Sequence, residues 1–102
     1  MHFVDLSNAD LQSANLQGSG MRFATLDNAN MSGASLSDTF SPLISAKSTQ
    51  FQRANLSQGY FLGSSFQNAD FTGADLSGAA FAYTDLRGAN FTNADLSNAF
   101  FI

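Results

Sequence analysis

The sequence predicts an all-β repeat solenoid that occupies the whole chain. Two observations carry this prediction. Large apolar residues recur every five residues from Leu6 to Phe101, and Gly or Asn recurs with the same period two positions later. A period of five fits neither a helix, which repeats near 3.6 residues, nor a strand, which repeats at 2. Self-similarity at a fixed period instead indicates stacked structural repeats.

The composition of the 102 residues agrees with this fold class. All eight acidic residues are Asp, and Asp, Asn, Ser and Gly favour turns over helices. The chain has no Cys, which excludes disulfides and thiolate metal sites. The formal net charge of −4 argues against direct binding of nucleic acid, which requires a basic patch. The length predicts a single domain over residues 1–102.

The large residue of each repeat is predicted to point inward. Leu, Met or Phe occupies eighteen of the twenty positions in this series, and only Ser41 and Ala46 break it. Two residues earlier the series is small from Ala9 onward, with Ile44 as the one large residue. Because Ile44 adjoins Ala46, the two changes in volume compensate each other. Each repeat therefore contributes one large and one small side chain to the interior.

Each repeat is also predicted to contain a tight turn. Gly or Asn lies two residues after the large residue in eleven of nineteen repeats. A type II turn needs positive φ at its third residue, which Gly and Asn adopt readily, and it accepts Pro one place earlier, where Pro42 falls. Asp or Asn often precedes the large residue, and we expect these side chains to satisfy backbone groups of the turn.

These repeats resemble the pentapeptide-repeat family, whose pattern is A(D/N)LXX. The pattern is followed by NADLS at 8–12, SANLQ at 13–17, GADLS at 73–77, GANFT at 88–92 and NADLS at 93–97, and the similarity covers residues 4–102. The resemblance implies a right-handed quadrilateral β-helix with four repeats per coil and about five coils. With about 4.8 Å between coils, the rod would be roughly 25 Å long.

The stretch SPLISAKSTQ at 41–50 departs from the pattern. It lacks the large residue twice, yet its length equals two repeats. We expect an irregular but continuous pair of repeats, and a segment looped out of the solenoid is the alternative. A looped-out segment would rotate the later faces relative to the earlier ones.

With four repeats per coil, residues twenty apart stack in columns on four faces. The outward columns of three faces are polar and acidic. Face one carries Asp5, Thr25, Ser45, Ser65 and Asp85; face two carries Asp10, Asn30, Gln50, Asp70 and Asn90; face three carries Asn15, Ser35, Asn55, Asp75 and Asp95. A candidate acidic surface consists of Asp70, Asp75, Asp85 and Asp95.

Face four is apolar instead. Its outward column reads Gly20, Phe40, Tyr60, Ala80 and Phe100. Apart from Phe3, every Phe, Tyr or Leu outside the inward series falls on this face. An apolar stripe on a small protein marks an interaction surface. We therefore expect a side-by-side interface formed by Phe23, Phe40, Leu43, Tyr60, Leu62, Tyr83, Phe100 and Ile102, unless residues 41–50 fold back and cover part of it.

The sequence offers no constellation for catalysis. We expect the single histidine, His2, to be a disordered terminal residue rather than a metal ligand. No GxSxG, HExxH or phosphate-binding loop occurs, so we expect no enzyme, no cofactor, no metal and no small-molecule substrate. The start shows no signal peptide and no apolar run could span a membrane, so we expect a cytoplasmic protein without membrane contact.

We therefore expect a non-enzymatic structural or protein-interaction module that forms a homodimer through face four, with a further protein partner as an option. End-to-end pairing is an alternative, since no capping helix is visible, and so is truncation from a longer chain. The resemblance implies a second function: some bacterial members mimic DNA and bind type II topoisomerases such as gyrase, while many others, abundant in cyanobacteria, have no assigned activity. A DNA duplex of ~25 Å bears about fifteen negative charges, whereas this chain has eight Asp offset by four Lys or Arg. We therefore expect DNA mimicry by this chain alone to be weak.

Overall fold

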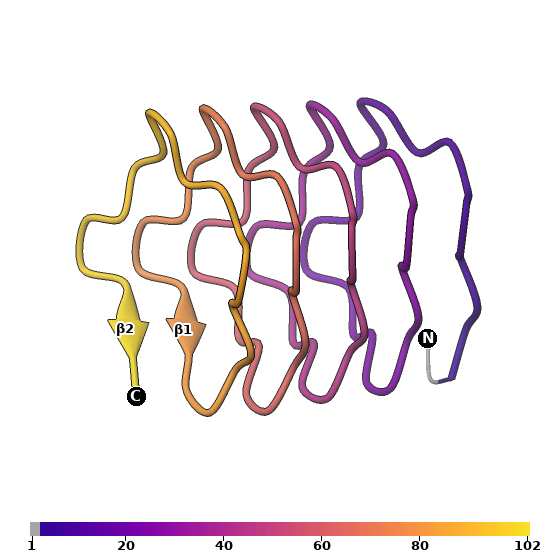
Figure 1. Cartoon of the computed structure of the whole chain (residues 1–102). Helices are drawn as coiled ribbons and strands as arrows, with labels where there is room; N and C mark the ends of the chain where they lie inside the picture. The colour runs from indigo at the N-terminus through magenta and orange to yellow at the C-terminus, as the bar shows by residue number, and fades with distance from the viewer. Residues whose placement is uncertain (1–2) are drawn as a thin grey trace.

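The computed structural model describes residues 3–102, which wind as one right-handed quadrilateral β-helix around a filled interior (Figure 1). Parallel bridges join residues twenty apart, for example Asn30 to Gln50 and Gln50 to Asp70. Each coil therefore contains four repeats of five residues, which confirms the predicted fold class. The chain measures 29 × 25 × 22 Å along its principal axes.

Extended backbone is confined to very short stretches. The two strands are β1 (Ala80–Phe81) and β2 (Phe100–Phe101), which pair in parallel with Ala80 opposite Phe100. Along the rest of the described chain the neighbouring coils are joined by isolated parallel bridges, because a turn interrupts every repeat. The N–H of the corner residue adds a further hydrogen bond between coils, as from Asn8 to the Asp27 carbonyl at 2.9 Å. No helix occurs among residues 3–102, and hence none long and apolar enough to cross a membrane.

The corner of every repeat has the left-handed backbone that its turn requires. Every fifth residue from Phe3 to Asn98 has φ between 56° and 76°. The N–H of the small residue then donates to the carbonyl of the large residue three positions earlier, as from Ala9 to Leu6 at 3.1 Å. This geometry confirms the type II turn expected from the Gly and Asn positions.

Four turns within the described residues lack this closing bond, and each ends at a β-branched residue: Thr39, Ile44, Thr49 and Thr84. The turns that close end at Ala, Ser or Gly. Branching at Cβ crowds the backbone and restricts its side-chain rotamers, which accounts for the wider turns. The Ser64 hydroxyl bridges the open turn that ends at Ile44. Its Oγ accepts the N–H of Ile44 at 3.1 Å and donates to the Ser41 carbonyl at 3.3 Å.

Ladders of large side chains fill the interior. Phe51, Phe71 and Phe91 stack behind face two, with ring centroids 5.0 and 5.1 Å apart. Leu36, Leu56 and Leu76 are fully buried behind face three. Because these side chains occupy the space between the walls, no pocket is found among residues 3–102.

Segment 41–50 lies in register with its neighbours. Ser45 bridges Thr25 and Ser65, and the corner residues Leu43 and Ser48 have φ of 61° and 56°. The alternative of a looped-out segment is therefore wrong, and so is the alternative in which it folds back over face four. The segment is continuous but irregular, because its two turns, which end at Ile44 and Thr49, both lack the closing hydrogen bond. Its inward side chains are irregular as well, and Ser41, Ile44 and Ala46 are all buried.

Candidate interaction surface

Face four consists of three columns of residues. The wall column is confirmed by parallel bridges and by the pairing of β1 with β2, and it contains Gly20, Phe40, Tyr60, Ala80 and Phe100. The middle column lies two positions later and contains Arg22, Pro42, Leu62, Ala82 and Ile102. The corner column contains the positive-φ residues Phe3, Phe23, Leu43, Gly63 and Tyr83.

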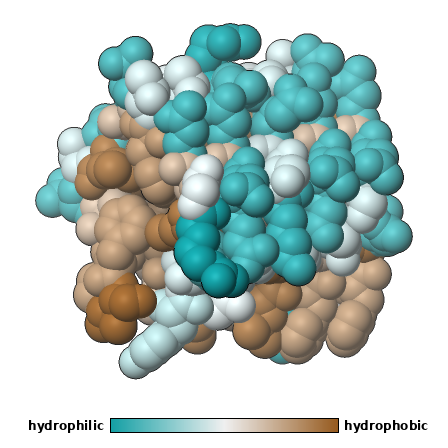
Figure 2. Space-filling view, viewed as in Figure 1, coloured by the Kyte–Doolittle hydropathy of each residue, from teal (hydrophilic) through white to brown (hydrophobic). Residues whose placement is uncertain are grey.

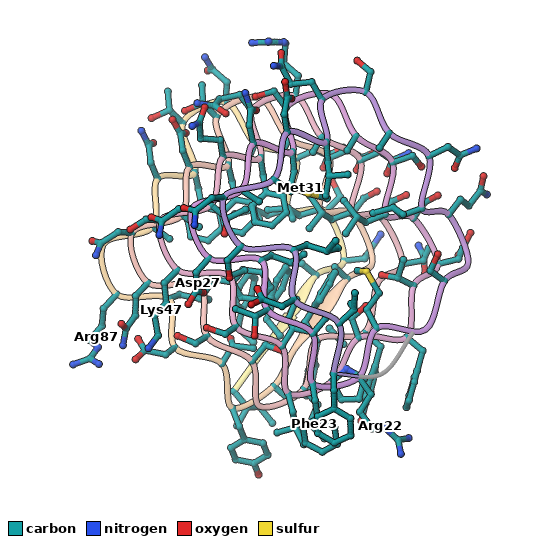
Figure 3. All side chains as sticks on the ribbon, turned by 90° about the vertical axis from the view of Figure 1, so that its right-hand side faces the viewer. Arg22, Phe23, Asp27, Met31, Lys47 and Arg87 are labelled. Carbon is teal, nitrogen blue, oxygen red and sulfur yellow. The ribbon has the colours of Figure 1, made fainter. Side chains whose placement is uncertain are left out.

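The large apolar side chains of this face are exposed to solvent. Phe40 is 47% exposed, Tyr60 38% and Tyr83 72%, whereas Leu62 is half-buried. Figure 2 shows apolar side chains along the lower edge of the molecule and over the C-terminal coil at the left. Figure 3 places Phe23 and Arg22 at the lower edge, away from Asp27, Lys47 and Arg87. All eight residues predicted for the interface therefore lie on one side of the rod.

Stacking orders the rings of this surface. Phe3 stacks on Phe23 with centroids 4.8 Å apart, and Phe40 stacks on Tyr60 at 5.2 Å. The guanidinium carbon of Arg22 lies 5.5 Å from the centroid of the Phe40 ring, within the range of a cation–π interaction. These contacts hold the exposed rings in defined positions without covering them.

Phe3 belongs to face four as well, which the sequence-based prediction had wrong. The structure places it at the head of the corner column, where its N–H donates to the Arg22 carbonyl at 3.1 Å. The signal was present in the sequence, because Phe3 precedes Phe23 by twenty residues. Phe3 lies before Leu6, the first large inward residue of the series, and so precedes the first complete repeat.

The corner column of face four shares the positive φ of every other corner and differs from them in its side chains. Every large apolar side chain with positive φ belongs to it: Phe3 at 58°, Phe23 at 62°, Leu43 at 61° and Tyr83 at 57°. The corners of the other faces hold Gly, Asn, Asp, Ser, Gln or Arg. For a bulky L-residue the left-handed region costs about 1–2 kcal/mol. The turn requires this conformation at the corners of all four faces, so it is the size and exposure of the side chains that single out face four.

On faces one to three, the outward Asp and Asn side chains hold the backbone of their own repeat. Each accepts the N–H of the residue two positions later at 2.9 to 3.3 Å. The residues are Asp5, Asp10, Asn15, Asn30, Asn55, Asp70, Asp75, Asp85, Asn90 and Asp95. These hydrogen bonds confirm the local role that the sequence predicted.

Face four has no such arrangement. Its wall side chains offer no carboxylate or amide oxygen, and Pro42 has no N–H to donate. The N–H groups of Arg22 and Leu62 find no hydrogen-bond partner within the described part of the chain. The outward side chains of this face therefore have no part in closing their own repeats.

The four acidic residues considered as one surface are spread over three faces. Asp85 lies on face one, Asp70 on face two, and Asp75 and Asp95 are neighbours on face three. The Asp85 carboxylate forms an ion pair with Arg87 at 2.7 Å and accepts a hydrogen bond from Gln67, and together these contacts hold its pKa far below the ordinary value. The four Asp residues therefore do not form one continuous acidic patch.

Hydrogen bonds also lower the pKa of other carboxyl groups. The hydroxyl and N–H of Thr72 lower the pKa of Asp70, and those of Ser97 lower the pKa of Asp95. No group of three potential metal ligands occurs in residues 3–102. His2 lies outside the described residues.

Comparison with known proteins supports the architecture. A family model for pentapeptide repeats matches eight copies over residues 4–40, 49–82 and 70–102. The chain is similar to the pentapeptide repeat protein Rfr23 from the cyanobacterium Cyanothece 51142, with 20% identity and a TM-score of 0.56, over 81% of this chain and 64% of Rfr23. No curated protein matches the chain.

A trypsin-treated variant of QnrB1, a plasmid-mediated fluoroquinolone resistance protein, is 30% identical with a TM-score of 0.59. The match covers 93% of this chain and 48% of QnrB1. The chain thus spans less than two thirds of either solved structure. Its likeness to Rfr23 shows the fold alone, whereas the family match covers most of the sequence. The chain belongs to the pentapeptide-repeat family, and this membership supports a non-enzymatic repeat protein.

Proposed function

We propose that this chain is a non-enzymatic, cytoplasmic interaction module that forms a homodimer through face four. One observation carries the proposal. Large apolar side chains are displayed at positive φ on this face and on no other. Every corner of the solenoid has this backbone conformation, so the feature that distinguishes face four is its exposed apolar surface, and association is favoured because a partner removes that surface from water.

The charge distribution supports association through this face. Arg22 is the one charged residue in its three columns as far as the structure describes them. Faces one to three carry Asp in their outward columns, and their outward Asp and Asn side chains are engaged in hydrogen bonds within the chain. Covering face four therefore removes few charges from water, so the desolvation penalty is small.

Solution mass measured by size-exclusion chromatography with light scattering tests the proposal. We expect about twice the chain mass of 10.8 kDa for the wild type. Phe40→Lys and Tyr60→Lys should each shift the protein to the monomer, because a lysine must then be desolvated in the interface. Gln17→Lys adds the same charge at an exposed site of face three and should leave the dimer intact.

Circular dichroism should verify that each variant is folded. A wild type that stays monomeric at every concentration would contradict the proposal. So would a dimer that survives both Phe40→Lys and Tyr60→Lys. Phe101 lies 43% exposed on the C-terminal coil, so loss of the dimer in Phe101→Lys alone would instead indicate end-to-end pairing.

The likeness to QnrB1, a fluoroquinolone resistance protein, favours one second candidate. This candidate is the binding to a type II topoisomerase such as gyrase that the family resemblance implies for some members. The charge count argues against it, because a duplex as long as the 29 Å rod would bear about seventeen phosphates, whereas eight Asp are offset here by four Lys or Arg. A gyrase supercoiling assay with and without a fluoroquinolone tests it. Absence of both inhibition and protection at micromolar protein would exclude this function.

A further inference from the structure

We propose that two copies pair face four to face four in antiparallel orientation, about a two-fold axis that passes through Tyr60. This inference rests on the homodimer proposed above and adds its orientation and register. A symmetric dimer is the commonest homo-oligomer, and its interface must be complementary to itself. The residues of face four determine which symmetric arrangement is favourable.

Two orientations bring this face against its own copy. With the two-fold axis parallel to the rod, each coil faces the same coil of the second copy. With the axis perpendicular to the rod and in the plane of the interface, the order of the coils is inverted. In the inverted arrangement, the wall column faces the wall column and the corner column faces the corner column.

Charge selects the inverted orientation. Arg22 lies in the middle column of face four. Parallel rods would place the two Arg22 side chains directly opposite each other, where like charges are unfavourable. Inversion about Tyr60 places them at opposite ends of the interface, roughly 19 Å apart along the rod for four coil spacings of about 4.8 Å.

Side-chain size then selects the register. The wall column reads small, large, large, small, large, from Gly20 through Phe40, Tyr60 and Ala80 to Phe100. Inversion about Tyr60 brings Phe100 opposite Gly20, Phe40 opposite Ala80, and Tyr60 opposite itself. In the wall column every other large residue thus meets a small one, and all five levels are used. In the corner column the same register sets Leu43 against Tyr83 and Gly63 against itself, so the match in size is a property of the wall column.

Neighbouring registers lack this match. An axis between Tyr60 and Ala80 would set Phe40 against Phe100, and an axis between Phe40 and Tyr60 would set those two large rings against each other. An axis through Phe40 would leave Ala80 and Phe100 without a counterpart. Among the large wall residues Tyr60 is the least exposed, 38% against 47% for Phe40 and 50% for Phe100, so it is the one best suited to meet its own copy.

The small positions provide room for the opposing rings. A Cβ placed on Gly20 would meet only the Phe40 carbonyl oxygen, at 3.9 Å. The Arg22 guanidinium lies over the ring of Phe40, the next residue of the wall column after Gly20. The second copy's Phe100 would enter next to it, where an aromatic ring and a guanidinium attract each other.

The area of the face fits a second copy of this size. From the principal extents of 29 × 25 × 22 Å, one lateral side offers roughly 600 Å², so a face-to-face pair would bury about 1,200 Å² in total. This is the lower end of the range for specific interfaces. The area is sufficient when the two surfaces are self-complementary and nearly free of charge.

Single cysteines can map the register, since the chain has none of its own. Facing sheets lie about 10 Å apart, beyond the span of a disulfide, so the probe is a short bis-maleimide that links two thiols. Tyr60→Cys should cross-link to itself. Phe40→Cys and Ala80→Cys should cross-link several-fold better when mixed than either does alone. Gln17→Cys on face three is the matched control and should give no cross-linked dimer.

A swap of side-chain sizes gives an independent measurement. Ala80→Phe should raise the dimer dissociation constant roughly tenfold or more, because the new ring meets Phe40 of the second copy. Adding Phe40→Ala in the same chain should restore most of the affinity, since large and small then exchange places. Failure of the second substitution to restore association would overturn the register, provided that both variants show the wild-type circular dichroism spectrum.

The outcomes separate the two proposals. A wild-type dimer that Phe40→Lys dissociates, but in which Tyr60→Cys does not cross-link, would overturn the register and leave face four as the interface. Equal cross-linking of Phe40→Cys alone and in the mixture would do the same. A wild type that is monomeric would overturn the homodimer together with its register.

Discussion

Faces three and four share one backbone and differ in what their outward residues do. Both have parallel bridges every twenty residues and positive φ at every corner. On face three the outward oxygen of Asn55 accepts the N–H of Ser57 at 2.9 Å, whereas Tyr60 in the same coil has no such role. The difference shows that a single position per repeat decides whether a face satisfies its own backbone or stays available for a partner.

The comparison separates stability from association. Behind both faces the inward residues fill the same core, so their loss should affect folding. In front of face four the outward residues contact solvent, so their loss should affect assembly. Four predictions test this separation, beginning with the largest expected effect.

Leu56→Ala should lower the free energy of unfolding by about 3 kcal/mol, because Leu56 is fully buried behind face three and its truncation leaves a cavity. Tyr60→Ala, four residues later on face four, should change the stability of the monomer by less than about 1 kcal/mol. Urea denaturation at low protein concentration measures both. Equal losses in the two variants would break the distinction between core and outer surface.

Gly18→Ala should destabilise the protein by about 1 kcal/mol, and Gly20→Ala by almost nothing. Gly18 is the corner between faces three and four, with φ of 73° and no atom within 4 Å of a built Cβ, so the penalty is purely conformational. Gly20 begins the wall of face four without positive φ. Thermal unfolding of the two variants, monitored by circular dichroism, provides the comparison. A larger loss in Gly20→Ala would contradict the assigned turn.

Asn55→Ala should cost about 0.5–1.5 kcal/mol, because it removes the acceptor for both the N–H and the hydroxyl of Ser57. Phe40→Ala removes a residue at the equivalent position of face four and should leave monomer stability nearly unchanged while weakening association. Paired urea titrations and light scattering report the two effects. If Asn55→Ala shifted the oligomeric state and Phe40→Ala did not, the roles of the two faces would be reversed.

Acidification should have the smallest effect per residue, since the carboxylates concerned are accessible to solvent. The pKa values of Asp5, Asp70, Asp85 and Asp95 are lowered by hydrogen bonds in the folded chain. Their contribution to stability is therefore fully present above the unfolded-state pKa of about 4 and is lost as pH falls through the lower folded-state values.

Thermal melts between pH 7 and pH 2 should accordingly show a constant midpoint down to about pH 5 and a fall below pH 4. Face four has no carboxylate side chain in its three columns as far as the structure describes them, so in a His2→Ala variant, which lacks the one histidine of the chain, the dimer dissociation constant should not change between pH 7 and pH 5. A midpoint that rose on acidification would contradict the assigned hydrogen bonds.

The repeat of five could be predicted from the period in the sequence, whereas four repeats per coil followed from the resemblance to the pentapeptide-repeat family. Once five residues make one side and twenty make one coil, the wall column from Gly20 to Phe100 can be written down without coordinates. The same arithmetic extends to Phe3, which precedes the first complete repeat.

Other features depended on contacts that a period does not encode. Ser41 and Ala46 interrupt the inward series, and nothing local in the sequence shows that the bridges of Ser45 continue across them. The open turns at Thr39 and Ile44 arise from branching at Cβ, and the repair by Ser64 comes from the next coil. Such compensation between coils becomes visible only when the side chains are placed together.

The bridges between residues twenty apart also determine how a chain of this kind can change in length. One added repeat would suit the interior, since every repeat supplies a similar pair of inward side chains. It would nevertheless turn everything after it by a quarter of a coil, and the apolar column would continue on a neighbouring side. Only the gain or loss of a whole coil keeps that column straight, so the outer surface, rather than the core, determines the units in which this rod can grow or shrink.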